Sequence, residues 1–101
     1  MRYYVDMHII TQKRIWEAQR KYPKCKSALE QWYRIVKKNN FTSFSDIQKL
    51  LPSTDKVGKY YIFDIGGNKL RLIAICHFQY NKLYIREILS HSEYDKNKWK
   101  K

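Results

Sequence analysis

The sequence predicts an α+β fold in which an N-terminal strand and a helical hairpin pack on an antiparallel β-sheet, followed by a short C-terminal helical turn. Apolar residues recur at helical spacing as far as Asn40, and from Val57 they alternate with a period of two. Turn-forming residues divide the alternating half into three segments. The sheet is therefore expected to contain a three-stranded meander together with the N-terminal strand.

Length and composition fit one folded domain over residues 1–101, with a basic tail at 97–101. Hydrophobic residues make up 44% of the chain, which argues against global disorder. Cys25 and Cys76 lie in unrelated contexts, without the spacing of a zinc site. The sequence also lacks both the ~20-residue apolar run of a membrane span and a signal peptide. We therefore expect a reduced, cytoplasmic protein with no cofactor, no metal and no membrane contact.

The charge balance indicates a polyanionic partner. Lys and Arg number 21 against 9 Asp and Glu, which gives a formal net charge of +12 and a pI of about 9.8. Aromatic residues reach 16%, and aromatic rings stack on unpaired bases in single-stranded RNA recognition. Solubility alone could explain some of these lysines, but +12 exceeds what a small protein needs. The composition thus favours contact with nucleic acid, RNA in particular.

A short strand and two helices are predicted in the first half. The apolar run at residues 7–10 predicts the N-terminal strand. Thr11 is the candidate N-cap of the first helix, which ends at Pro23, and the second helix ends at Asn39 and Asn40. Because a proline joins the two helical patterns, they predict an αα-hairpin.

A connector and three strands are predicted in the second half. Residues 41–53 are expected to hold a short helical turn that Ser45 caps and Pro52 closes. The segment Gly66-Gly67-Asn68 contains residue types that tolerate positive φ in hairpin turns. The strands are expected at residues 57–65, 69–78 and 83–89.

Side-chain alternation assigns two faces to this sheet, provided that Phe78 pairs with Leu83. One face is mixed and carries Arg71 and Arg86, together with Tyr60, Ile62, Asp64, Ile73, Ile75, His77, Tyr84 and Ile88. The other face is almost entirely apolar, so the helical hairpin should pack there. Its members are Tyr61, Phe63, Leu70, Leu72, Ala74, Cys76, Phe78, Leu83, Ile85 and Leu89.

The mixed face and the segment after it could cleave RNA. Attack by the 2′-hydroxyl needs a base, cations for the phosphorane charge and an acid for the leaving 5′-oxygen, and no metal is obligatory. Arg71 and Arg86 can supply the cations, because a guanidinium matches two phosphate oxygens. His91 and Tyr94 are the nearest candidates for proton transfer.

Each of these residues also has a purely structural interpretation. Arg71 could be only the cross-strand partner of Asp64, and Arg86 could face solvent. Ser90 and Glu93 match a capping box, so His91 could simply begin a short helix. Tyr94 could pack the C-terminal turn on the core.

Further residues are candidates for RNA binding. Lysines around the first hairpin could hold phosphates, and aromatic residues on the mixed face could stack on bases. Trp99 among the last lysines either stacks on RNA or belongs to a frayed tail. The candidates are Lys56, Lys59, Lys69, Tyr60, Tyr84 and His77.

Four segments resemble the HigB family of RelE-like toxins, the mRNA interferases of bacterial toxin-antitoxin pairs. They are "MHIITQK", "KYP", "YYIFDIGGNKLRLIA" and "YIREILSHSEYDK", and together they run from Met7 to about Lys96. The first six residues, "MRYYVD", fall outside the resemblance: they are a short extension, or Met7 is the true start.

The resemblance implies a RelE-like fold and a ribosome-dependent endoribonuclease that acts on mRNA at the 70S ribosome. It also implies a HigA-like antitoxin with a helix-turn-helix, through which alone the complex would contact operator DNA. Arg71 and Arg86 resemble the arginines that RelE-type toxins place on central strands. His91 and Tyr94 resemble residues of their C-terminal catalytic segment.

Two other readings stay open on the sequence alone. A non-catalytic basic module could bind RNA or DNA through Tyr60, Tyr84 and Arg86 without cutting a bond. A protein of toxin fold could also have lost its activity and serve as a regulator's partner.

Overall fold

The computed structural model describes residues 7–67 and 69–100, and it has the predicted α+β architecture. The predicted extension at residues 1–6 and the turn residue Asn68 lie outside the described residues. The strands are β1 (His8–Ile10), β2 (Asp55–Val57), β3 (Tyr60–Ile65), β4 (Leu70–His77) and β5 (Lys82–Ser90). The α-helices are α1 (Lys13–Lys21), α2 (Lys26–Lys38), α3 (Phe44–Leu50) and α4 (His91–Asp95), and Pro23–Cys25, Phe78–Tyr80 and Lys98–Lys100 are 3-10 helices.

The strands form one mixed sheet in the order β1-β5-β4-β3-β2. The prediction of an antiparallel sheet holds for β2 to β5, whereas β1 runs parallel to β5 at the sheet edge. The predicted strand at 57–65 is in fact two strands, because Gly58 adopts φ +60° and turns the chain between β2 and β3. The sheet thus has one strand more than predicted.

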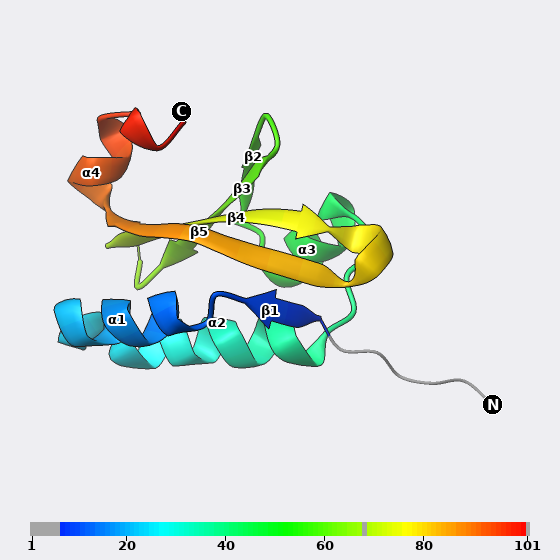
Figure 1. Cartoon of the computed structure of the whole chain (residues 1–101), viewed down its shortest axis with the longest axis horizontal. Helices are drawn as coiled ribbons and strands as arrows, with labels where there is room; N and C mark the ends of the chain where they lie inside the picture. The colour runs from blue at the N-terminus through cyan, green and yellow to red at the C-terminus, as the bar shows by residue number, and fades with distance from the viewer. Residues whose placement is uncertain (1–6, 68, 101) are drawn as a thin grey trace.

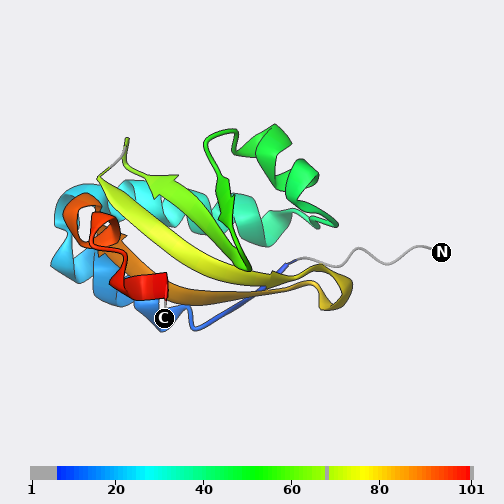
Figure 2. The ribbon, with the colours of Figure 1, turned by 90° about the horizontal axis from the view of Figure 1, so that it is seen from above.

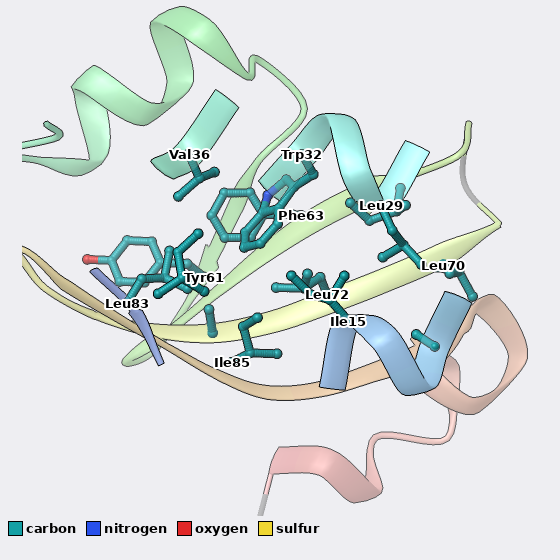
Figure 3. Close-up of a cluster of buried hydrophobic side chains, with 14 of the residues drawn as sticks. Ile15, Leu29, Trp32, Val36, Tyr61, Phe63, Leu70, Leu72, Leu83 and Ile85 are labelled. Atoms are coloured by element: carbon teal, nitrogen blue, oxygen red, sulfur yellow. The ribbon is translucent and has the colours of Figure 1, made fainter. Parts of the chain in front are cut away.

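The helical hairpin covers one face of the sheet, as predicted (Figure 1). Side chains of α1 and α2 point at the apolar face of β3, β4 and β5, and Trp32 meets Phe63 edge-on with ring centroids 5.2 Å apart (Figure 3). Periodic apolar residues on both layers explain this packing, because each layer removes the other's apolar surface from water. The residues labelled in this core are Ile15, Leu29, Trp32, Val36, Tyr61, Phe63, Leu70, Leu72, Leu83 and Ile85.

Two predicted helix caps are wrong. Thr11 adopts φ 65° before α1, and its hydroxyl donates to the Ile85 carbonyl at 2.9 Å instead of capping the helix. The short helix α3 begins after Ser43, whose Oγ accepts from the Asp46 N–H at 3.3 Å, so Ser43 and not Ser45 is the cap. Thr11 thereby ties the start of α1 to β5.

A β-bulge in β5 changes the predicted faces of the sheet. Cys76 pairs with Leu83, two residues from the expected register, and this even shift leaves the alternation intact near the loop. The register then slips between Ile73 and Ala74, so that Arg86 is the extra residue in β5. Beyond it the predicted faces are exchanged. Ile88 packs on the helical core and Leu89 on the other face, the reverse of the prediction.

A second, smaller cluster lies on the face away from the helical hairpin. Tyr60, Ile62 and Ile73 are buried there with Trp99, which is only 4% exposed. Figures 1 and 2 show α4 and the following turn on this side of the sheet. The prediction that Trp99 binds RNA or frays is therefore wrong: Trp99 anchors the C-terminal segment.

No α-helix within 7–67 and 69–100 is long and apolar enough to cross a bilayer.

Candidate active site

Arg71 lies on β4 directly opposite Asp64 on β3, as the alternation predicted. Its Nη1 is 2.8 Å from Asp64 Oδ1, and the arginine side chain is 13% exposed. That nitrogen is buried, and the ion pair lacks good hydrogen-bond geometry. The guanidinium also lies over the ring of Tyr94, with Cζ 5.5 Å from the centroid. Arg71 therefore joins the sheet to α4.

Arg86 is presented on the same side of the sheet by the bulge. It is exposed, and its Cζ lies 6.0 Å from the centroid of Tyr60. Bulges commonly redirect a side chain in this way beside active sites. Because Tyr60 and Tyr94 belong to one cluster with Trp99, and Arg71 lies over Tyr94, both predicted arginines lie on one side of the sheet.

Aromatic rings connect the two arginines. Tyr94 stacks on Trp99 at 5.0 Å and 13°, and Trp99 meets Tyr60 edge-on at 5.6 Å. Arg71, Tyr94, Trp99, Tyr60 and Arg86 thus form a continuous series of contacts, which we call the arginine–aromatic cluster. Two cations at the ends of one packed cluster are suited to holding a phosphate.

Tyr94 is half-buried within this cluster, and its environment favours the neutral phenol. Burial raises the pKa of Tyr94 above 10.0, and the carboxylate of Asp55 adds to the effect, while Arg71 opposes it. At neutral pH the phenol therefore keeps its proton. It is a candidate proton donor, not a base.

His91 begins α4, and the capping box predicted as its structural interpretation is present. Ser90 Oγ accepts from the Glu93 N–H at 3.2 Å, and the Glu93 carboxylate accepts from the Ser90 N–H at 3.2 Å. The His91 side chain is 56% exposed, with Nε2 3.4 Å from Asp95 Oδ2. Within the described part of the chain, His91 makes no ring or ion contact with either arginine.

A hollow of about 680 Å³ adjoins the arginine–aromatic cluster at Arg86. It contains an aromatic pair, His77 and Tyr84, whose rings meet edge-on at 5.3 Å. Two guanidinium groups, those of Arg14 and Arg86, also line it. Rings and cations together suit an unpaired nucleotide.

Comparison with known proteins identifies the family of this chain. A family model described as the HigB toxin, the RelE-like toxic component of a toxin-antitoxin system, matches residues 25–97. The chain belongs to the HigB toxin family. This confirms the family predicted from the sequence.

Relatives of known name agree with this assignment. The mRNA interferase toxin HigB of Escherichia coli strain K12 is 39% identical over 92 residues, which cover 88% of this chain and 88% of that protein. The mRNA interferase HigB of Shigella flexneri matches to the same extent. That of Escherichia coli O6:H1 strain CFT073 is 37% identical over 93 residues, 89% of this chain and 90% of the relative.

The candidate RNA-binding residues of this HigB-family chain do not all lie on one surface. Lys59 lies with Nζ 5.4 Å from the Tyr60 ring, beside the arginine–aromatic cluster. Lys56 instead lies over Tyr61, 5.7 Å from its centroid, and donates to the Gly58 carbonyl at 2.7 Å. Lys69 is exposed at the turn between β3 and β4. Of the three lysines, Lys59 is thus the best placed to contact an RNA strand that crosses the arginine–aromatic cluster.

The sequence predicts no role for Arg14 or Glu87, and it does not indicate the burial of Trp99. Arg14 and Glu87 meet at the hollow only because β1 pairs with β5 and brings the start of α1 beside the bulge. Lysines surround Trp99 in the sequence and predict a solvent-exposed basic tail there. No local sequence signal marks these positions.

Two further observations concern metal ligands and thiols. Within 7–67 and 69–100, no three or more His, Cys, Asp or Glu side chains gather as a group that could hold a metal ion. Both cysteines are free, and burial raises the pKa of Cys76 to about 12. The Cys76 thiol is therefore protonated and a poor nucleophile at neutral pH.

Proposed function

We propose that this chain is an mRNA interferase: an endoribonuclease toxin that cleaves mRNA on the translating 70S ribosome. The observation that carries the proposal is the arginine–aromatic cluster, which holds Arg71, Arg86 and Tyr94 on one face of a strongly basic domain. The names of the relatives, mRNA interferase HigB, support the same activity.

The proposed reaction is an attack of the 2′-hydroxyl on the adjacent phosphate. The O2′–P bond forms, the P–O5′ bond breaks, and a 2′,3′-cyclic phosphate and a free 5′-hydroxyl result. Arg71 and Arg86 neutralise the charge on the phosphorane oxygens. Tyr94, a neutral phenol at pH 7, donates a proton to the departing O5′.

His91 is the proposed acceptor of the 2′-hydroxyl proton. Its exposed imidazole can reach a substrate laid across α4, and Asp95 at 3.4 Å stabilises the imidazolium that results. This role depends on the RNA path, because His91 stands outside the arginine–aromatic cluster.

The ribosome would supply alignment that the free toxin lacks. Orienting the mRNA for in-line attack lowers the barrier without any stronger acid or base on the protein. We propose that the remaining cationic surface docks on ribosomal RNA, and that the protein works in the cytoplasm. A HigA-like helix-turn-helix antitoxin is the proposed inhibitor and carries any contact with operator DNA.

The test is primer-extension mapping of mRNA in a reconstituted translation reaction. The wild type should create new ends on translated message but not on naked RNA. Arg86→Ala should abolish them, and His91→Ala should reduce them. Arg34→Ala is the matched control, because Arg34 is an exposed arginine on α2 that pairs with Glu30. Intact message with wild type would overturn the proposal.

A second variant separates catalysis from simple binding. Arg86→Lys keeps the charge but loses the planar fork of the guanidinium. A catalyst should lose roughly a hundredfold or more in cleavage rate, the usual cost of losing one transition-state donor. If neither the wild type nor Arg86→Lys cleaves and both bind RNA equally, the chain is a non-catalytic binding module.

A further inference from the structure

Trp99 is buried although the chain around it is strongly polar. Its neighbours Lys98 and Lys100 are exposed, whereas Trp99 itself is 4% exposed and belongs to the cluster with Tyr60, Ile62 and Ile73. One deeply buried ring thus fixes the last turn of the described chain to the sheet.

Trp99 makes two kinds of contact with Tyr94. The two rings stack at 5.0 Å with an interplanar angle of 13°. The indole Nε1–H also donates to the Tyr94 carbonyl at 2.9 Å. Together these contacts fix both the backbone and the ring of Tyr94.

The same indole contacts Tyr60 edge-on, at 5.6 Å and 81°. Tyr60 and Tyr94 are the rings under the two predicted catalytic arginines: Arg86 lies over Tyr60 and Arg71 over Tyr94. Trp99 therefore stands between two cation–ring pairs, one that joins β5 to β3 and one that joins β4 to α4.

We propose that Trp99 is a positioning residue for RNA cleavage: it holds Tyr94 and Tyr60 so that the guanidinium groups of Arg71 and Arg86 keep one mutual geometry. The inference rests on the proposed function for its catalytic consequence. Trp99 itself touches neither arginine through a described contact and acts through the two tyrosines.

A purely structural anchor would behave differently from a positioning residue. An anchor needs only bulk, so any large apolar side chain at position 99 should restore activity once the protein folds. A positioning residue needs a flat ring against Tyr94 and Tyr60. Phe and Leu therefore distinguish the two roles, because both are apolar but only Phe offers a ring face.

The first measurement compares Trp99→Phe and Trp99→Leu with the wild type in the translation reaction. Trp99→Phe should retain most of the activity. Trp99→Leu should lower kcat by about tenfold to a hundredfold, the scale of an ångström-sized misplacement, with a much smaller change in KM. Trp16→Leu is the matched control, because Trp16 is 57% exposed on α1. Circular dichroism establishes that each variant is folded.

A second measurement follows the NMR signals of the arginine side chains and does not depend on RNA cleavage. Guanidinium signals over aromatic rings are displaced in ¹H–¹⁵N NMR spectra by the ring current. Trp99→Leu should move the Nε signals of both Arg71 and Arg86, while Trp16→Leu should move neither.

The outcomes separate the two proposals. A wild type without cleavage contradicts the proposed function, and the NMR spectra then still decide whether Trp99 positions the arginines. A folded Trp99→Leu variant with wild-type kcat, or with both arginine signals unmoved, overturns the role of Trp99. An equal loss in Trp99→Phe and Trp99→Leu also overturns it, because a ring would then not suffice.

Discussion

Tyr94 and His91 are three residues apart in sequence, yet they occupy different environments. Tyr94 is half-buried between Trp99 and Arg71, and burial keeps its pKa above the ordinary value. The His91 imidazole is 56% exposed, and its Nε2 lies 3.4 Å from Oδ2 of Asp95, which is also exposed. A fixed group can transfer a proton at a defined place, whereas an exposed one depends on the substrate to define its position. We therefore expect a substitution at Tyr94 to lower the cleavage rate more than a substitution at His91.

This difference predicts unequal effects of two substitutions. Tyr94→Phe keeps the stacked ring but removes the phenol, so the cleavage rate should fall by about a hundredfold or more with little change in stability. His91→Ala should cost less than Tyr94→Phe. Single-turnover cleavage rates measure both.

The pH dependence gives an independent check on Tyr94. Because its pKa is raised above 10.0, a proton donor at this position stays protonated to that pH, and no alkaline loss should arise from Tyr94 below about pH 9. A larger loss in His91→Ala would assign the main role to the imidazole instead. An alkaline limb near neutral pH that disappears in Tyr94→Phe would contradict the raised pKa of Tyr94.

At the level of the elements, α4 is secured by one carboxylate. Glu93 accepts from the Ser90 backbone N–H and hydroxyl, both at 3.2 Å, and from the Tyr22 hydroxyl at 3.3 Å. Tyr22 follows α1, so Glu93 links the C-terminal helix to the helical layer. The hydrogen bond from the Ser90 N–H, and then that from its hydroxyl, lower the pKa of Glu93 below 4.5.

The lowered pKa predicts a pH dependence of stability. The folded state favours the Glu93 carboxylate more than the unfolded state does. Glu93 therefore contributes to the free energy of unfolding at pH values above its pKa in the unfolded chain. This contribution to the free energy of unfolding is lost as the pH falls below 4.5 and passes through the pKa of Glu93 in the folded state.

Urea unfolding measures this effect. Between about pH 6 and pH 3, the wild type should lose more free energy of unfolding than Glu93→Gln, whose amide does not titrate in that range. Glu17→Gln, which removes an exposed carboxylate from α1, is the control. Equal pH dependence in wild type and Glu93→Gln would contradict this assignment.

Most elements could be predicted because their signals are local. Helical spacing and strict alternation depend on the nearest residues, and they correctly placed the helical hairpin, the meander and the Arg71–Asp64 pair. The bulge at Arg86 was not predicted, because strict alternation puts each successive residue on the opposite face and leaves no place for an extra residue within a strand. The strand β2 has only three residues and forms through pairing with β3.

The site was predictable in its residue types but not in its assembly. The chemistry of both arginines and Tyr94 predicts a role for them from the sequence, and the structure brings them together through Tyr60 and Trp99. The connecting tryptophan sits in a lysine-rich segment, where composition indicates solvent exposure. Only the tertiary packing of that segment on the sheet shows its burial.

For the molecule as a whole, the net charge of +12 predicts salt-dependent binding to RNA. These positive charges strengthen RNA binding most where lysines and arginines lie along the RNA backbone and contact its phosphates. Arg14 and Arg86 line one hollow, and Lys59 and Arg86 lie over one ring, so these three residues mark a path from the start of α1 to the arginine–aromatic cluster. Lys24, in the 3-10 helix between α1 and α2, is not among the residues that line this hollow or lie over the Tyr60 ring.

The salt dependence of single variants tests this path. Each phosphate contact on a single strand contributes about −0.7 to the slope of log K against log salt concentration, because binding releases condensed counterions. Lys59→Gln and Arg14→Gln should each reduce the magnitude of the slope by about that amount, while Lys24→Gln should leave it unchanged. Fluorescence anisotropy with 2′-O-methyl RNA measures the binding, since this ligand lacks the attacking hydroxyl. If all three variants reduced the slope equally, the RNA would sense the total charge of the domain and no defined path.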